Sequence, residues 1–390
     1  MPAEKTPVDS AIDPITFEVI RHKLRAIIDE QEITLKSVSG SPIVTEASDF
    51  SNGIYLSDGS SLMFGRQSLV HADSVASMVR NTIADCEENP GIDSGDQFIV
   101  NDPWKGAVHA SDVGIVSPIF YEGKRVGWAG ALAHQIDVGG MEFGSWCPKA
   151  VDRYQEGFNL PPLKIVENGK LRQDVWNMIM SASRLPFLIG LDLRAMIAAN
   201  NVARRRFTAL IERYGLDTVL NVANGLLAHS ERRLRERLKE LPDGIYRAVD
   251  FIDHDGHENR VYKVNITLTK AGDSLTFDFT GSSPQAPGFI NCTHTGLPGA
   301  VLGAVYPMLA YDIPWNEGLA RTVKIVAPKG MVCNAESPAP TSAAVCATAW
   351  VALNAATAAV SKLVSCSDKY RRELEAVANG SFVTLNLGGL

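Results

Sequence analysis

Residues that can bind metals or move protons are concentrated in one stretch, which begins with N-D-P-W and ends with A-H-Q-I-D-V-G-G. Two H-x-x-D patterns occur in it, His109 with Asp112 and His134 with Asp137, and Asp102 lies just upstream. Imidazole suits zinc, manganese and iron, and carboxylates favour the harder ions of that set. These residue types therefore indicate a divalent metal site. The plainer alternative is a polar loop, because His and Asp are frequent in loops and turns.

A β-hairpin would bring the two ends of this stretch together. The apolar runs VGIVSPIFY and RVGWAGALA are typical of strands, and the E-G-K between them predicts a tight turn. Antiparallel pairing places Asp112 across from His134 and His109 roughly across from Asp137, and directly opposed Cβ atoms lie about 5 Å apart. A shift of the register by one residue would instead send these side chains to opposite faces.

The composition is that of a globular protein. Of the 390 residues, 45% are hydrophobic and 21% are charged, and a chain of this length predicts two or three domains. The net charge of −7 argues against a general binder of nucleic acid or anionic membranes. Basic clusters at 204–206 and 232–239 lie in helical patterns, and no aromatic stacking platform accompanies them. We therefore expect neither nucleic acid nor a membrane as a partner.

The six cysteines are widely scattered and none has C-x-x-C spacing. Reduced thiols explain this usage most simply. The N-terminal segment MPAEKTPVDSAIDP has no apolar core of the signal-peptide kind. The sequence therefore predicts a cytoplasmic protein.

The patterns predict a mixed α/β fold in three regions. Residues 1–165 contain a sheet around the central hairpin and carry the metal site, and residues 166–243 are helical, with one break at Pro186. Residues 244–390 are rich in strands and end on the strand-like FVTLNL, which predicts a missing C-terminal portion. The Ala-rich run at 341–360 is long enough to span a membrane, but its Thr, Ser and Asn favour a buried core helix.

Other candidate motifs are weaker. The chain has no G-x-x-x-x-G-K-[ST], G-x-G-x-x-G after a strand, or G-x-S-x-G, so it is not expected to bind a nucleotide in a familiar way. His254 and His257 could form a second ligand cluster, although I-D-H-D-G-H-E also reads as a polar turn. His71 lies near Asp73 as in a catalytic triad, but Asp73 before Ser74 is more typical of a helix cap.

At these residues the chain resembles the hydantoinase B/oxoprolinase family, and matching motifs run nearly from end to end. They include D-P-I-T-F-E-V-I-R at 13–21, G-D-Q-F-I-V-N-D-P-W at 95–104, H-A-S-D-V at 109–113, A-H-Q-I-D-V-G-G at 133–140, E-G-F-N-L-P-P at 156–162, I-A-A-N at 197–200 and N-E-G at 316–318.

The resemblance implies a B-type subunit of a heteromeric, ATP-dependent hydrolase of cyclic amides such as hydantoins, 5-oxoproline or lactams. Its partner would be an A-type, actin-like ATPase that binds the ATP. Carried over by motif, the metal ligands would be His109, Asp112 and His134, with Asp102 or Asp137 as a further ligand. Zinc or manganese is expected, with iron as a third choice. The usual family pattern has a second His at the position of Gln135, which is a departure in this chain.

In the expected mechanism the partner activates the ring amide with ATP, and this chain holds the ring and directs water at the activated carbon. Asp137 is the expected general base if it is not a ligand. Trp104, Phe143 and Trp146 could form apolar walls of the substrate pocket, or they could be core residues. Two alternatives remain open: the metal-containing subunit of a ketone carboxylase of the acetone or acetophenone type, and a non-catalytic scaffold with a structural metal.

Overall fold

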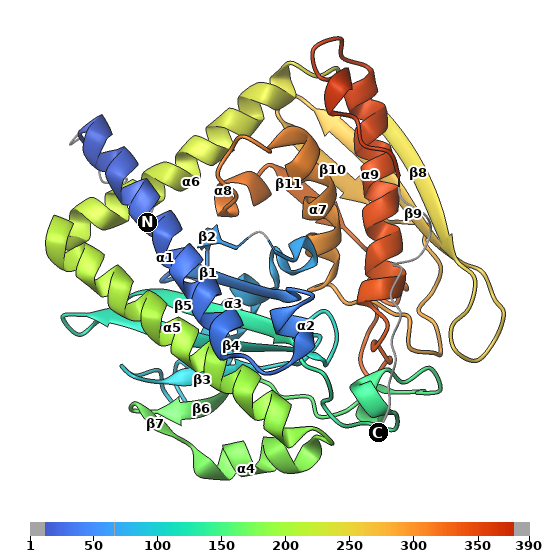
Figure 1. Ribbon diagram of the computed structural model, residues 1–390. Helices are drawn as coiled ribbons and strands as arrows, with labels where there is room; N and C mark the ends of the chain where they lie inside the picture. Colours follow the sequence, from blue (N-terminus) through green and yellow to red (C-terminus); the bar gives the residue numbers. More distant parts are fainter. Residues whose placement is uncertain (1–11, 66, 378–390) are drawn as a thin grey trace.

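The computed structural model describes residues 12–65 and 67–377, which form two β-sheets with helices packed against them (Figure 1). This confirms the predicted mixed α/β class. The first sheet contains β1 (Phe50–Leu56), β2 (Ser61–Phe64), β3 (Gln97–Val100), β4 (Asp112–Tyr121), β5 (Lys124–His134), β6 (Leu163–Glu167) and β7 (Lys170–Leu171).

The central hairpin of β4 and β5 forms the middle of the first sheet, whose order is β2-β1-β5-β4-β3-β6-β7. Its neighbouring strands are all antiparallel, and Asp112 pairs with His134 as predicted. The predicted opposition of His109 and Asp137 is wrong, because β5 ends at His134 and the chain then leaves the ladder. Both faces of the hairpin are covered, which explains its continuous apolar runs.

Helices cover the two faces of the first sheet. On one face, α1 (Pro14–Val38) and α5 (Pro186–Tyr214) pack on the strands and on each other. On the other face, α3 (Ser74–Cys86) approaches the hairpin closely, because β4 and β5 carry glycines where it crosses. A Cβ at Gly114 would lie 2.2 Å from Met78 Sδ, and one at Gly130 would lie 2.4 Å from Val75 Cγ1. The elements from α1 to α6 are called the first half of the molecule, and those from β8 onward the second half. Among the described residues the first half also contains α2 (Pro42–Thr45), α4 (Gln173–Ala182) and α6 (Leu216–Lys239).

The second sheet has the order β11-β10-β9-β8 and packs against two apolar helices. Its strands are β8 (Gly244–Ile252), β9 (Tyr262–Ala271), β10 (Ser274–Asp278) and β11 (Val323–Val326), and the nearby helices are α7 (Leu297–Leu309), α8 (Glu317–Ala320) and α9 (Trp350–Ser365). A π-helical turn, Val345–Ala349, precedes α9. The helical run Val345–Ser365 is long and apolar enough to cross a membrane, but 72% of its most apolar window is buried inside the protein. Its apolar character is thus explained by packing in the core.

Several details differ from the sequence-based expectations. The first sheet continues past residue 165 into β6 and β7, and the helical middle packs on that sheet through α5. The Ala-rich run begins as a loop, and helix starts only at the π-helical turn. Asp73 does not cap α3 with its side chain, because its carboxylate pairs with Arg80 at 2.7 Å. The predicted strand FVTLNL lies outside the described residues.

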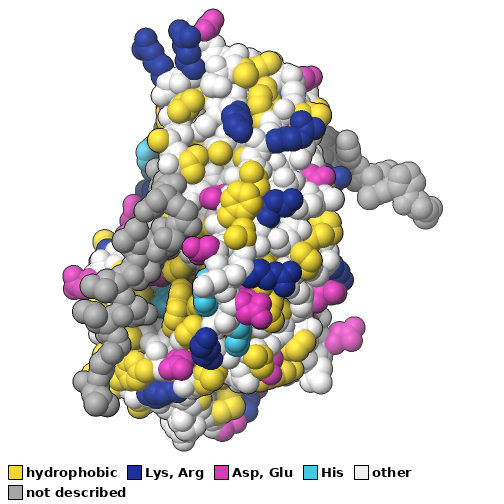
Figure 2. All heavy atoms as spheres, turned by 90° about the vertical axis from the view of Figure 1, so that its right-hand side faces the viewer, with side chains coloured by type: hydrophobic (Ala, Val, Ile, Leu, Met, Phe, Trp, Pro, Cys, Tyr) yellow, Lys and Arg dark blue, Asp and Glu magenta, His cyan; other side chains and the backbone are white. Residues whose placement is uncertain are grey.

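Figure 2 shows the side of the molecule that carries the second sheet, where apolar, basic and acidic side chains are interspersed. The edge strand β8 alternates between buried and exposed positions. Its exposed residues include Ile245, Val249 and Phe251, and Lys263 is exposed on the neighbouring β9. The sheet thus buries one face against α7 and α9 and leaves the other to solvent.

Gly299 offers a stability test of the contact between α7 and the short 3-10 helix η1 (Leu69–His71). A Cβ at Gly299 would lie 1.8 Å from the carbonyl oxygen of Val70, which is a backbone atom that cannot turn aside. We expect Gly299→Ala to lower the free energy of unfolding by about 2–3 kcal/mol, measured by urea denaturation.

The matched control is Gly303→Ala, one turn further along α7. Its Cβ would lie 3.2 Å from the flexible tip of Leu353 and 3.8 Å from Leu69 Cβ, which is an ordinary van der Waals distance. Because alanine favours helix, this variant should change the free energy of unfolding by less than about 1 kcal/mol. Equal effects of the two variants would contradict the assigned contact.

Candidate metal centre

Three neighbouring strands bring polar side chains to one edge of the first sheet. Asp112 begins β4, His134 ends β5, and Asp49 immediately precedes β1. Because β5 runs antiparallel to both β1 and β4, these three positions meet at the same edge. The backbone N–H of His134 donates to the carbonyl oxygen of Asp49 at 3.1 Å, which extends the ladder by one step.

His109 joins this edge through the tight turn that leads into β4. The N–H of Asp112 donates to the carbonyl oxygen of His109 at 3.0 Å, so that both side chains of the H-x-x-D pattern lie on the same side. His109 Nε2 lies 3.3 Å from Asp112 Oδ1, and His134 Nδ1 lies 3.5 Å from that oxygen. The two ring nitrogens are 3.0 Å apart. The three ligand atoms therefore all lie within 4.8 Å of one another.

These positions fit a divalent cation. In a tetrahedral site with bonds of about 2.0–2.1 Å, neighbouring ligand atoms lie about 3.3 Å apart. Both carboxylate oxygens of Asp112 are buried, and neither accepts a well-aligned hydrogen bond from the residues that the structure describes. A buried carboxylate without such partners is costly. A shared cation would satisfy it together with the two imidazoles.

The charges in this group are strongly coupled. Burial would raise the pKa of Asp112, but the neighbouring imidazoles of His109 and His71 outweigh it and hold the pKa well below its usual range. Burial opposes a charge on His109, yet the Asp112 carboxylate prevails and raises the pKa of His109 to about 9. The pKa of His71 is also raised, again because Asp112 outweighs burial. The buried Asp112 carboxylate is therefore stabilised by positive charge on the neighbouring groups.

Two outer contacts orient the ligands. His109 Nδ1 lies 2.8 Å from the carbonyl oxygen of Ser342, and because a carbonyl only accepts, Nδ1 carries the proton. Its Nε2 is then the nitrogen that faces Asp112 and His134. On the other side of the carboxylate, His71 Nε2 lies 3.3 Å from Asp112 Oδ2. Asp112 is thus held between the histidine ligands on Oδ1 and His71 on Oδ2.

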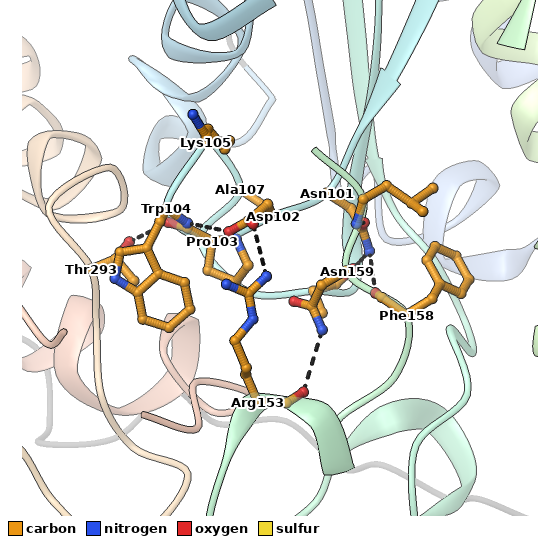
Figure 3. Close-up of polar contacts among 12 residues, drawn as sticks. Asn101, Asp102, Pro103, Trp104, Lys105, Ala107, Arg153, Phe158, Asn159 and Thr293 are labelled. Atoms are coloured by element: carbon orange, nitrogen blue, oxygen red, sulfur yellow. Dashed lines mark hydrogen bonds and ion pairs between the residues drawn. The ribbon is translucent and has the colours of Figure 1, made fainter. Parts of the chain in front are cut away.

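Asp102, a predicted ligand, does not belong to this group. Its Oδ2 forms an ion pair of 2.8 Å with Arg153, and its Oδ1 accepts a hydrogen bond from the Trp104 N–H at 2.8 Å (Figure 3). The guanidinium of Arg153 also lies over the Trp104 ring, 4.8 Å from its centre. With both oxygens engaged, Asp102 fastens the N-D-P-W turn to the loop that carries Arg153.

Asp137 also lies in a different environment. It is fully buried, and its oxygens accept hydrogen bonds from the N–H groups of Gly139, Gly144 and Arg184 at 2.9–3.1 Å. The Arg184 guanidinium donates to it at 2.9 Å. The carboxylate is therefore saturated by donors that hold the V-G-G loop in place.

The predicted pocket residues are spread over the junction of the two halves. Trp104 Nε1 donates to the carbonyl oxygen of Ala335 at 3.0 Å, and Trp146 packs edge to face on Phe289. Phe143 is 42% exposed. Their role as walls of a substrate pocket stays a prediction.

Gln135, where a second His was expected, is fully buried, and its amide donates to the carbonyl oxygen of Ala133 at 3.1 Å. Among the described residues it is not part of the ligand group, which contains one His from this segment. His257 Nε2 contacts the carbonyl oxygen of Ala150, and His254 Nδ1 accepts from the Gly256 N–H, so both help to shape a turn.

Comparison with known protein families identifies the family of this chain. The family model described as hydantoinase B/oxoprolinase matches residues 13–389. The chain belongs to this family. The resemblance inferred from the sequence motifs is thereby confirmed.

Relatives in the hydantoinase B family differ in their named reactions. One relative, a putative D-/L-hydantoinase B subunit of Pseudomonas sp. (strain NS671), is 34% identical over 348 residues, which cover 85% of this chain and 58% of the relative. The structure of an acetone carboxylase without nucleotide matches with a TM-score of 0.88 and 25% identity, over 96% of this chain and 51% of that one. The ATP-dependent caprolactamase of Pseudomonas jessenii matches with a TM-score of 0.86 and 28% identity, over 93% and 62%. The chain thus spans about half to three fifths of the length of these proteins.

Three residues of the site were not assigned to it from composition and spacing. Asp49 had a usable signal, because S-D-F-S leads into a strand that begins at the same edge of the sheet. His71 and Glu156 had none, since only the tertiary fold brings them near the ligands. The Glu156 carboxylate accepts hydrogen bonds from the segment that contacts His109.

Asp102→Asn tests whether Asp102 is a structural residue. Both side chains of its ion pair with Arg153 are mostly buried, while Asn keeps an acceptor for the Trp104 N–H. We expect the free energy of unfolding to fall by about 2 kcal/mol, which is the usual loss for a hydrogen bond to a charged group. Metal content, measured by mass spectrometry, should not change.

Arg153→Gln is the partner variant. If the two residues act on each other, the double variant should lose less stability than the sum of the single losses. Loss of metal at unchanged stability in Asp102→Asn would instead make Asp102 a ligand.

Proposed function

We propose that this chain is the metal-binding B-type subunit of an ATP-dependent hydrolase of cyclic amides. The group of His109, Asp112 and His134 carries the proposal, because its ligand atoms converge around a buried carboxylate. Membership of the hydantoinase B family supports the reaction class, since relatives are named as part of a hydantoinase and as a caprolactamase. Two imidazoles with one carboxylate suit zinc or manganese best, with iron as a third choice.

The partial exposure of the ligand group to solvent favours a catalytic metal site over a structural one. Structural metal sites are closed, whereas catalytic sites keep one position open to water or substrate. The side chain of His134 is 22% exposed and that of Asp49 is 36% exposed, although Asp112 is fully buried. One side of the ligand group therefore faces solvent, which argues against a scaffold with a structural metal.

In the proposed reaction the bound metal would act as a Lewis acid that activates water or polarises the ring carbonyl. His109 presents Nε2 to the site because its Nδ1 proton is held by the Ser342 carbonyl oxygen. Asp49 is our choice for the group that accepts the proton of the attacking water, since its Oδ2 lies 3.9 Å from His134 Nδ1 at the exposed side. Asp137, the base expected from the sequence, is better suited to positioning, because its oxygens are saturated.

We further propose that an A-type, actin-like ATPase binds the ATP and forms a hetero-oligomer with this chain. A stable amide ring needs activation, and the chain has no familiar nucleotide-binding motif to supply it. One relative is named as a single subunit of its hydantoinase, which supports a heteromeric enzyme. The free cysteines support a cytoplasmic location.

The second candidate is the metal-containing subunit of an ATP-dependent ketone carboxylase. The acetone carboxylase structure matches this chain about as well as the caprolactamase does, with TM-scores of 0.88 and 0.86, so the fold is compatible with either reaction. Both reactions develop negative charge on an oxygen, as an oxyanion in hydrolysis and as an enolate in carboxylation. The same ligand group could stabilise either of them.

The metal site can be tested by mass spectrometry of the purified chain supplied with zinc and manganese. We expect about one metal ion per chain in the wild type and none in His109→Ala, His134→Ala or Asp112→Asn, since three ligands are a minimum for such a site. His22→Ala, on the exposed face of α1, is the control and should keep the metal. A folded wild type without metal would refute the proposal.

The reaction can be tested on the complex of this chain with its ATPase partner. With ATP, we expect the complex to open the ring of a hydantoin, 5-oxoproline or a lactam. The product is measured by chromatography. Loss of an outer hydrogen-bond partner of a metal ligand typically costs 10–100-fold, so loss of a ligand itself in Asp112→Asn should reduce kcat by about 100-fold or more. Incorporation of labelled bicarbonate into a ketone, without ring opening, would favour the carboxylase instead.

A further inference from the structure

A buried carboxylate links the two halves of the molecule next to the metal centre. Glu156 follows the short helix η3 (Arg153–Gln155) in the first half and is 1% exposed. Its Oε1 accepts from the N–H of Ser342 and its Oε2 from the N–H of Thr341, both at 2.7 Å. Among the described residues its partners are these donors rather than a cation.

The segment held by Glu156 is the one that orients His109. The carbonyl oxygen of Ser342 accepts from His109 Nδ1 at 2.8 Å, while the Ser342 Oγ accepts from the N–H of Cys147 at 3.2 Å. Ser342 is therefore fixed at its N–H, its side chain and its carbonyl. The carbonyl belongs to the next peptide unit, which shares the Cα of Ser342 with the unit that Glu156 holds. A shift of the held unit would therefore move this Cα and displace the carbonyl.

We propose that Glu156 is a positioning residue for the metal site, which holds the Ser342 carbonyl where it fixes the tautomer and the direction of His109. This inference rests on the proposed metal centre. The chain of hydrogen bonds begins at Glu156 in the first half, passes through Ser342 in the second half, and ends at the ligand His109 in the first half. The metal geometry would then depend on how the two halves are docked.

A purely stabilising role is a poor explanation for this arrangement. A buried carboxylate loses its hydration, and burial raises the pKa of Glu156 to about 7 even though the two N–H groups oppose the rise. Apolar packing at the same place would usually stabilise a fold at least as well. What the carboxylate adds is direction, since two short hydrogen bonds fix two consecutive peptide units.

The chain offers a matched control in Asp192. This carboxylate is also fully buried, and its Oδ1 accepts from two consecutive backbone groups, the N–H of Gly40 at 2.9 Å and that of Ser41 at 3.1 Å. The clamped segment leads into α2, and among the described residues Gly40 and Ser41 form no hydrogen bond with a metal ligand. Asp192→Asn should therefore cost stability without changing the site.

The test compares wild type, Glu156→Gln and Asp192→Asn by zinc titration against a competing chelator. Gln can accept only one of the two hydrogen bonds. We expect Glu156→Gln to bind zinc about tenfold more weakly, at the low end for outer partners of a metal ligand, and Asp192→Asn to bind as the wild type does. Substitution with cobalt provides a second readout, because its visible spectrum should change in Glu156→Gln only.

A measurement on metal-free protein separates this inference from the proposed function. In chains labelled with ¹⁵N-histidine and measured above about pH 9, where the His109 ring is neutral, the wild type should show the proton on Nδ1, and Glu156→Gln should weaken or lose that signal. Glu156→Asp, which keeps the charge but shortens the reach, should show an intermediate effect and serves if Gln prevents folding. Unchanged zinc affinity and an unchanged His109 signal in a folded variant would overturn the inference, as would equal losses in Asp192→Asn. A wild type that binds neither zinc nor manganese would refute the metal centre alone.

Discussion

The register of three antiparallel strands is the constraint on which the site depends. β1, β5 and β4 lie side by side, and only their present alignment puts Asp49, His134 and Asp112 at the same edge. A slip by one residue would turn a ligand to the opposite face. The register is fixed from both faces of the sheet. Gln31 on α1 donates to the carbonyl oxygen of Gly130, and Asn200 on α5 donates to that of Ile115, while α3 packs closely against the glycines of the hairpin.

The second half of the molecule completes a site that the first sheet begins. The carbonyl oxygen of Ser342 accepts the hydrogen bond of His109. The π-helical turn carries Cys346, whose thiol interacts electrostatically with the carboxylates of Asp49 and Asp112. Burial, together with the charges of Asp49 and Asp112, raises the pKa of the Cys346 thiol to about 12. Single turns of π-helix are frequent at functional sites, because the extra residue re-aims the backbone. The site thus lies between the edge of the first sheet and the π-helical turn that precedes α9.

Local pattern was enough to predict the hairpin, its turn and the pairing of Asp112 with His134, because alternation and turn chemistry act over a few residues. The second sheet and the long helices of the middle were predictable for the same reason. The H-x-x-D pattern of His109 and Asp112, together with His134, predicted the three residues whose ligand atoms converge. Asp102 and Asp137 could not be separated from ligands in this way, since Arg153 and Arg184, which engage them, lie 51 and 47 residues away. Glu156 opens one of the family motifs, but its role could not be predicted, because its partners are backbone groups, which leave no trace in side-chain chemistry.

The junction between the halves shows why this fold accepts costly polar burial. Besides Glu156, the Thr293 hydroxyl donates to the carbonyl oxygen of Pro103 at 2.6 Å (Figure 3). The indole N–H of Trp104 donates to the carbonyl oxygen of Ala335. Each of these contacts has a direction, whereas an apolar interface tolerates small shifts at little cost. A shift between the two sheets would move the Ser342 carbonyl oxygen, which lies 2.8 Å from His109 Nδ1. The polar junction therefore stabilises one relative position of the two sheets, and the geometry of the ligand group follows from that position.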